Sequence, residues 1–161
     1  MDSITALAYS LDYPWLKAAG WFIDDAIVYA ALVLLIVIAA ERRDEKRLKI
    51  LASLVLAFAA SFIIKSALAI ERPCAGEEWC RADHSFPSIH ASVAFALMTG
   101  FIGKRSYPLF LLFALFVSFT RLNIGVHYFV DIAAALPVAL VSYYVTDIFW
   151  KREVSRHGPR A

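Results

Sequence analysis

Residues 120–131 read TRLNIGVHYFVD and place an arginine, a histidine and an aspartate between two long apolar segments. Ionisable groups in such a position are costly in a membrane unless they are paired or hydrated, so they indicate a functional site. His127 and Asp131 are four residues apart, a spacing that puts them on one face of a helix. The carboxylate can then accept a hydrogen bond from one imidazole nitrogen, leaving a lone pair on the other for use as a nucleophile or base. Taken alone, the stretch fits a buried helix-capping pair equally well.

The apolar segments around this stretch belong to a strongly hydrophobic chain. Of its 161 residues, 61% are hydrophobic, and the mean hydropathy is +0.65, whereas a soluble domain of this size is closer to half apolar. The formal net charge of +2 is too small to indicate a nucleic-acid-binding protein. We therefore expect an all-α integral membrane helical bundle, with residues 1–161 forming a single membrane-embedded domain.

Five segments have the apolar character of membrane-spanning helices, namely residues 26–40, 50–70, 88–103, 107–122 and 127–150. Residues 3–22 are too polar to span, because Asp12, Pro14 and Lys17 interrupt their aromatic and aliphatic side chains. The pattern predicts a broken amphipathic helix that lies at the N-terminus on the membrane surface.

Charged residues at the ends of these segments predict the orientation of the bundle. With five spans, a charged loop at 41–49, a loop at 104–106 and a basic tail at 151–161 lie on one side, and they hold most of the lysines and arginines. The positive-inside rule makes this side cytoplasmic. The polar loop at 71–86 and the stretch at 120–131 then face the non-cytoplasmic side of a plasma or cell membrane.

The loop at 71–86 contains both cysteines of the chain, Cys74 and Cys80. On an oxidising side of the membrane they can form a disulfide, which we favour because two cysteines do not supply the four ligands of a structural metal site. Asp83 and His84 follow in the same loop. We expect them to form a solvated pair, with contact to a lipid headgroup as the alternative.

Further ionisable residues are predicted to gather at the same end of the bundle. Lys65 lies near the end of the second span, and Arg72 follows seven positions later, about two helical turns on. Pro73 disfavours helical geometry at Arg72, so the guanidinium is expected at the mouth of the bundle. Ser88 and His90 lie in the predicted first turn of the third span.

The three cations Lys65, Arg72 and Arg121 need an anionic partner, and Asp131 alone is too little. Arginine offers paired donors to phosphate oxygens, and lysine offers a point charge. The N-terminus of the third span adds free backbone N–H groups and the positive end of a helix dipole. Together these groups suit a phosphate.

The chemistry follows from this arrangement. His127, aligned by Asp131, is expected to attack phosphorus in line, while the three cations and the Ser88 hydroxyl stabilise charge on the equatorial oxygens. His90 is expected to protonate the leaving oxygen and then to deprotonate the water that cleaves the phosphohistidine. No metal and no cofactor are expected, because the cations supply the electrostatic stabilisation.

The order and spacing of these residues resemble the three-part signature of the type 2 phosphatidic acid phosphatase (lipid phosphate phosphatase) superfamily: Lys65-x6-Arg72-Pro73, Pro87-Ser88-Ile89-His90 and Thr120-Arg121-x5-His127-x3-Asp131. The resemblance implies a helical bundle and metal-independent hydrolysis, with His127 as the nucleophile and His90 as the acid. Two residues differ from the usual signature. Ile89 stands where the family usually has Gly, and Thr120 replaces a Ser.

We therefore expect an integral-membrane phosphatase that acts on a lipid phosphate or diphosphate among the surrounding membrane lipids. A site on the outer face suits a polyprenyl diphosphate that is cleaved to the monophosphate, and phosphatidylglycerophosphate or phosphatidic acid is the alternative. Two other classes remain open. A metal-dependent hydrolase could use His90, His127 and Asp131 as ligands, although three nearby cations oppose it. A transporter or proton relay would also need intramembrane charges, but here they gather at one end of the bundle.

Overall fold

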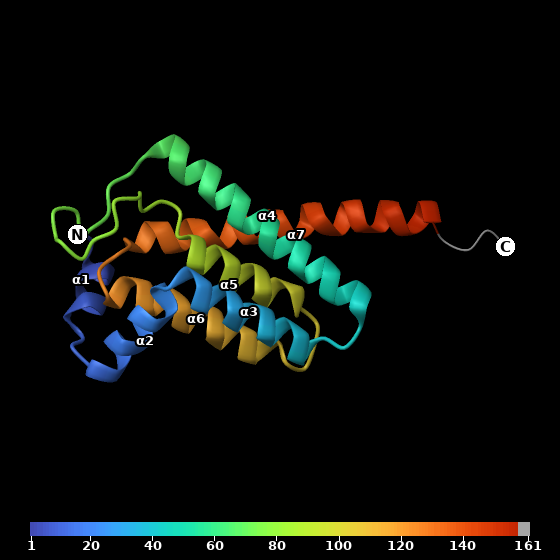
Figure 1. Cartoon of the computed structure of the whole chain (residues 1–161), viewed down its shortest axis with the longest axis horizontal. Helices are drawn as coiled ribbons and strands as arrows, with labels where there is room; N and C mark the ends of the chain where they lie inside the picture. The colour runs from blue at the N-terminus through green and yellow to red at the C-terminus, as the bar shows by residue number, and fades with distance from the viewer. Residues whose placement is uncertain (158–161) are drawn as a thin grey trace.

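The computed structural model describes the backbone of residues 1–157 and the side chains of residues 1–152. This part of the chain forms seven α-helices and contains no strand, so the all-α prediction is confirmed (Figure 1). The helices are α1 (Ser3–Ser10), α2 (Pro14–Asp24), α3 (Ala26–Ala40), α4 (Asp44–Leu68), α5 (Ile89–Gly100), α6 (Tyr107–Asn123) and α7 (Phe129–His157).

Helix α5 is the centre of the bundle and packs against α3, α4, α6 and α7. Its Ala91, Ala94, Ala96 and Leu97 are fully buried. The small alanine side chains allow neighbouring helices to approach closely, which is how helices commonly pack inside membranes. Large apolar side chains on the outer faces of the surrounding helices are exposed, as expected for surfaces that contact lipid: among them are Leu35, Val55, Phe62, Leu112 and Val141.

Each of the five predicted apolar segments overlaps one helix, α3 to α7, but these helices differ in length. Among the described residues, Asp44–Leu68 and Phe129–Arg152 are long and apolar enough to cross a membrane. The pair α2 and α3 would give a third span, although its two helices are bent by 88°. Helices α5 and α6 are apolar but shorter. The bundle therefore has two to three candidate spans by length and composition, surrounding the short central helix.

Two predicted boundaries are wrong because charged residues continue a helix beyond its apolar part. The predicted loop at 41–49 is only three residues long, since α4 begins at Asp44. Asp44 and Glu45 lie in its first turn, where acidic side chains favour the helix dipole, and Asp44 pairs with Arg47 at 2.8 Å. At the other end, α7 continues through residues 151–157 of the predicted tail. Residues 158–161 of that tail lie outside the described part of the chain.

The N-terminal region is broken before Pro14, as predicted, into α1 and α2. Both helices pack against α6. The Thr5 hydroxyl accepts a hydrogen bond from the Phe129 N–H at 2.9 Å, and the Asn123 side chain donates to the carbonyls of Ala8 and Leu11 at 2.8 Å each. Helix α1 therefore covers the junction of α6 and α7. It lies at the same end of the bundle as the loop that joins α4 to α5 (Figure 1).

Candidate active site

His127 and Asp131 form a buried pair where α6 passes into α7. The Asp131 Oδ2 atom lies 3.2 Å from the His127 Nδ1 atom and accepts a hydrogen bond from the Tyr128 N–H at 2.8 Å. Asp131 is in the first turn of α7, whereas His127 precedes that helix instead of starting it. One carboxylate thus orients the imidazole and satisfies a backbone donor near the start of α7. The His127 Nε2 atom is left with the lone pair that a nucleophile needs.

The environment of His127 favours the neutral imidazole. The residue lies in the short connection between α6 and α7, and its side chain is 2% exposed. Burial lowers the pKa of His127 well below its usual value, and the positive charges of Arg72 and Lys65 lower it further. A neutral ring keeps the lone pair available at neutral pH.

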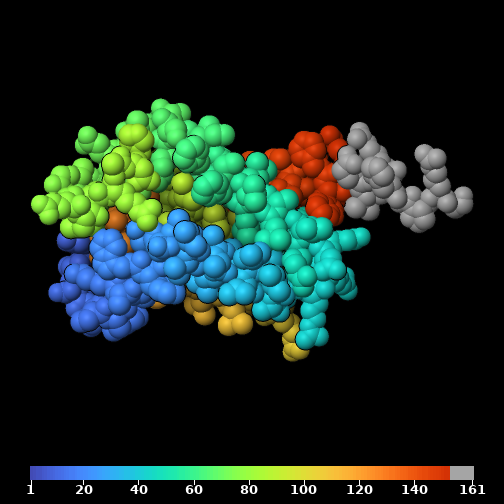
Figure 2. Space-filling model, in the orientation of Figure 1, coloured from blue at the N-terminus to red at the C-terminus, as the bar shows by residue number. Residues whose placement is uncertain are grey.

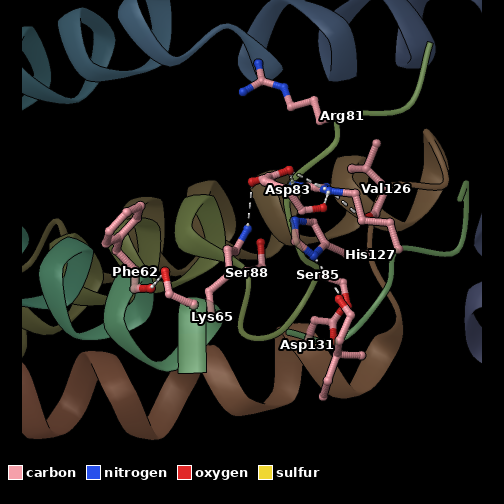
Figure 3. A network of polar contacts seen from close by, with 12 residues as sticks. Phe62, Lys65, Arg81, Asp83, Ser85, Ser88, Val126, His127 and Asp131 are labelled. Atoms are coloured by element: carbon pink, nitrogen blue, oxygen red, sulfur yellow. Dashed lines mark hydrogen bonds and ion pairs between the residues drawn. The ribbon is translucent and has the colours of Figure 1, made fainter. Parts of the chain in front are cut away.

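Lys65 and Arg72 lie beside this histidine and share an acidic partner from the loop between α4 and α5. Figure 3 shows the contact of that partner, Asp83, with Lys65. The Asp83 carboxylate lies 3.3 Å from the Lys65 Nζ atom and 2.6 Å from the Arg72 Nη2 atom. The expectation of a solvated pair between Asp83 and His84 is therefore wrong. Arg72 lies beyond the end of α4, and its side chain is buried. Its Nη1 also donates to the Val126 carbonyl at 2.9 Å.

The two neighbouring cations favour the charged form of Asp83. Partial burial raises the pKa of the Asp83 carboxyl group, but the positive charges of Arg72 and Lys65 outweigh it, and the pKa lies below its usual value. Asp83 is therefore ionised at neutral pH and offers a carboxylate to both cations.

Arg121 is completely buried and is held by α2. Its Nη1 atom lies 2.8 Å from an Asp24 carboxylate oxygen, and its Nη2 donates to the Gly20 carbonyl. Arg81 contacts the other Asp24 oxygen at 3.1 Å. The Arg121 Nε atom has no hydrogen-bond partner among the described residues, so one buried donor remains available. Arg121 is close enough to both His127 and His90 for its positive charge to interact with their rings.

Ser88 connects the second part of the signature to the third. Its N–H donates to the Asp131 carbonyl at 3.2 Å, and its hydroxyl oxygen accepts from the Ala91 N–H at 3.4 Å, which makes Ser88 the N-cap of α5. The hydroxyl hydrogen can still be donated to a ligand. The start of α5 is thus anchored directly to the start of α7.

His90 follows in the first turn of α5 and is positioned by α3. The Tyr29 hydroxyl donates to the His90 carbonyl at 2.9 Å, and the two rings lie 4.8 Å apart between centroids. His90 is within electrostatic range of His127. The two predicted catalytic histidines therefore lie at the same end of the bundle, on α5 and on the connection between α6 and α7.

An apolar cavity of about 310 Å³ adjoins His90. Helices α3, α4 and α5 line it, and its lining residues include Tyr29, Val33, Leu54, Phe58, Ile89 and His90. Figure 2 shows the surface furrow between α3 and α4, with atoms of α5 at its floor. A largely hydrocarbon-lined space beside a cluster of charged groups can take a molecule with an apolar chain and a polar head.

The loop that covers this end of the bundle contains the two cysteines. Cys74 and Cys80 are joined in a disulfide, with their Cα atoms 5.6 Å apart. The bond closes a short loop just before Arg81 and Asp83, the residues that contact Asp24 and the two cations.

The structure brings all seven predicted site residues to one end of the bundle. Three further residues, which were not predicted to belong to the site, contact these side chains: Asp24, Tyr29 and Asp83. In the sequence, the acidic pair Asp24-Asp25 precedes an apolar segment, and this pattern indicates only the start of a helix. Tyr29 is a single tyrosine near the start of that aliphatic segment, and the sequence pattern does not assign it to the site.

A helical membrane bundle that gathers two histidines, an aspartate and three cations at one end has the organisation of a membrane-integral phosphatase. Residues 47–154 match the PAP2 superfamily, and they make up more than half of the chain. The chain belongs to the PAP2 superfamily, which confirms the resemblance carried by the three motifs. Membership implies a lipid phosphatase.

Two solved structures share this fold. LpxE of Aquifex aeolicus is similar with a TM-score of 0.73 and 19% identity, over 90% of this chain and 93% of that one. The transmembrane PAP2-type phosphatidylglycerolphosphate phosphatase of Bacillus subtilis is similar with a TM-score of 0.71 and 18% identity, over 93% of this chain and 84% of that one. A comparison with curated protein sequences finds no match.

Proposed function

We propose that this protein is a metal-independent phosphatase of the membrane that hydrolyses a lipid phosphate or diphosphate through a phosphohistidine on His127. The observation that carries the proposal is the buried pair of His127 and Asp131 beside the buried cations Lys65 and Arg72. The pair supplies an oriented nucleophile, and the cations supply the charge that a phosphoryl group requires.

The reaction has two steps. In the first, the His127 Nε2 lone pair attacks phosphorus, the bond from phosphorus to the leaving oxygen breaks, and His90 donates a proton to that oxygen. In the second, His90 takes a proton from water, the water oxygen attacks the phosphohistidine, and orthophosphate leaves as the bond between nitrogen and phosphorus breaks. Asp131 stabilises the positive charge that develops on the His127 ring.

The cations and Ser88 hold the transferring group in this proposal. Lys65, Arg72 and the free Nε of Arg121 face the negative oxygens, and the Ser88 hydroxyl donates one hydrogen bond. Arg121 is fixed by its contacts with α2, and Ser88 is fixed at the start of α5, so these two donors need little reorganisation during the reaction.

The metal-dependent alternative finds little support in the donor set. Among the side chains that the structure describes, no three His, Cys, Asp or Glu groups come together as ligands for a metal ion. Asp131 is instead engaged with His127 and with the Tyr128 N–H. Hydrolysis in the presence of excess EDTA tests this point directly.

The apolar cavity beside His90 supports a substrate with a hydrocarbon chain. We propose a polyprenyl diphosphate, cleaved to the monophosphate, with phosphatidylglycerophosphate or phosphatidic acid as the alternative. The asymmetric distribution of lysines and arginines supports an active site on the non-cytoplasmic side of the plasma or cell membrane.

The test is phosphate release by the purified protein from a panel of these lipids, with and without EDTA. We expect release that survives EDTA, is fastest for the polyprenyl diphosphate and is absent in His127→Ala. Faster release from phosphatidylglycerophosphate or phosphatidic acid would instead identify that lipid as the preferred substrate. A protein that releases no phosphate from any of them would contradict the proposed activity and favour a transporter.

A further inference from the structure

Asp83 makes unusual contacts for a loop residue, because it binds both cations of the first motif at once. Its Oδ2 lies 3.3 Å from the Lys65 Nζ atom, and its Oδ1 lies 2.6 Å from Arg72 Nη2 and 2.9 Å from Arg72 Nε. The Lys65 and Arg72 side chains are 6% and 5% exposed, whereas that of Asp83 is 48% exposed. A half-exposed anion therefore contacts two buried cations, and Figure 3 shows its contact with Lys65.

The carboxylate occupies donors that a phosphate would need. Nη1 of Arg72 donates to the Val126 carbonyl at 2.9 Å, so the edge formed by Nε and Nη2 is the one left for a ligand. The Asp83 carboxylate contacts both of these donors, and the Asp83 carbonyl also accepts from Nε at 3.2 Å. A two-oxygen anion that spans an arginine edge and a lysine ammonium reproduces the contacts of a phosphate group. Asp83 and a phosphate cannot use these donors at the same time.

Asp83 can leave this position without unfolding the loop that carries it. The loop is fastened before Asp83 by the Cys74–Cys80 disulfide and by Arg81, which contacts the Asp24 carboxylate at 3.1 Å and the Asp24 carbonyl at 2.7 Å. After Asp83, the Ser85 N–H donates to the Ile70 carbonyl at 2.8 Å.

Space for the displaced side chain lies next to Asp83. A pocket of about 300 Å³ is lined by Asp83, Arg72 and other residues of the same loop. Rotation of this half-exposed side chain toward the pocket opens the Lys65 Nζ and the Arg72 Nη2 to a ligand, while the Asp83 carbonyl continues to accept from the Arg72 Nε at 3.2 Å.

We propose that Asp83 is a resident anion of the phosphate site, which an incoming phosphoryl group displaces and which returns when orthophosphate leaves. The inference rests on the phosphate site of the proposed function and adds a residue that sets its affinity. In the resting protein Asp83 partly neutralises two buried cations. A dianionic phosphoryl group carries more charge than a carboxylate and can displace it. The return of Asp83 then opposes tight retention of the orthophosphate product.

The test is the variant Asp83→Asn, which removes the charge and retains the shape of the side chain. The matched control is Glu78→Gln, the same change of charge at an exposed position of the same loop. We expect the inhibition constant for orthophosphate to fall about tenfold in Asp83→Asn, a modest change because the ion pair is half exposed, and the KM for the lipid phosphate to fall with it. Glu78→Gln should change neither constant by more than about twofold.

A second variant and a direct binding measurement complete the test. Asp83→Ser removes the anion with a smaller side chain and should give the same result if Asp83→Asn does not fold. Calorimetric titration with orthophosphate measures the site without turnover, so a failure of this inference and a failure of the proposed activity give different results. An unchanged or weaker orthophosphate affinity in the folded Asp83 variants would overturn the inference and make Asp83 a residue that only positions the two cations.

Discussion

The ion pair between Asp24 and Arg121 gives the sharpest prediction about stability. It joins residues 97 positions apart and holds α2 against the end of α6. The change Asp24→Asn keeps the size of the side chain and removes its charge. Arg121 is then left as a positive charge with no exposed surface and with the Gly20 carbonyl as its remaining partner on α2.

The size of the effect follows from this burial. Removing one partner of a buried ion pair costs about 3–5 kcal/mol. The Asp24 side chain is 13% exposed, and the Gly20 carbonyl continues to accept from Arg121, so we expect the lower end of that range. At roughly 2–4 °C per kcal/mol for a chain of this size, a loss of about 3 kcal/mol lowers the Tm by about 6–12 °C.

The assay is thermal unfolding in detergent, followed by the fluorescence of the four tryptophans. The neighbouring change Asp25→Asn is a matched control, because the Asp25 carboxylate caps α3 by accepting from the Ile27 and Val28 N–H groups. Asparagine caps a helix about as well as aspartate, so the Tm should change little in this control. Equal Tm values for the two variants would show that the Asp24–Arg121 pair does not stabilise the bundle.

The remaining predictions concern the reaction. Asp131→Asn should lower kcat by about 10³–10⁴ and leave KM within a few-fold, because it removes the charge that orients the His127 ring and stabilises it, and steady-state kinetics would check this. His90→Ala should lose activity on lipid phosphates, yet should accumulate phosphoenzyme from an aryl phosphate, whose leaving group needs no proton; rapid-quench experiments would detect it, and no accumulation would contradict the role of His90. Tyr29→Phe should cost about 1 kcal/mol of stability through the lost hydrogen bond to the His90 carbonyl, measured as a lower Tm.

The sequence predicted the apolar segments and the gathering of the signature residues, because both depend on local information. Hydropathy located five helices, and the motif spacing placed Lys65, Ser88 and Arg121 near helix ends at one side of the bundle. The start of α4 was missed because hydropathy locates the apolar part of a helix and not its charged first turn, which Asp44 and Arg47 stabilise.

The partners of the cations could not be predicted in the same way. Asp24 meets Arg121 only because α2 packs across α6, and Asp83 reaches Lys65 and Arg72 only because the loop folds back over the end of α4. Such contacts depend on tertiary packing between distant segments. The sequence showed that three cations needed anions, but it did not show that the protein supplies two of those anions itself.

The most direct test of the proposed mechanism is to trap the phosphorylated protein. Substrate labelled with ³²P is mixed with the protein, the reaction is quenched within milliseconds in alkali, and the labelled peptide is identified. A phosphohistidine on His127 predicts label that is stable in alkali and lost in acid, carried by the peptide with His127 and absent in His127→Ala. Label on another residue, or turnover by His127→Ala at the normal rate, would show that His127 is not the nucleophile.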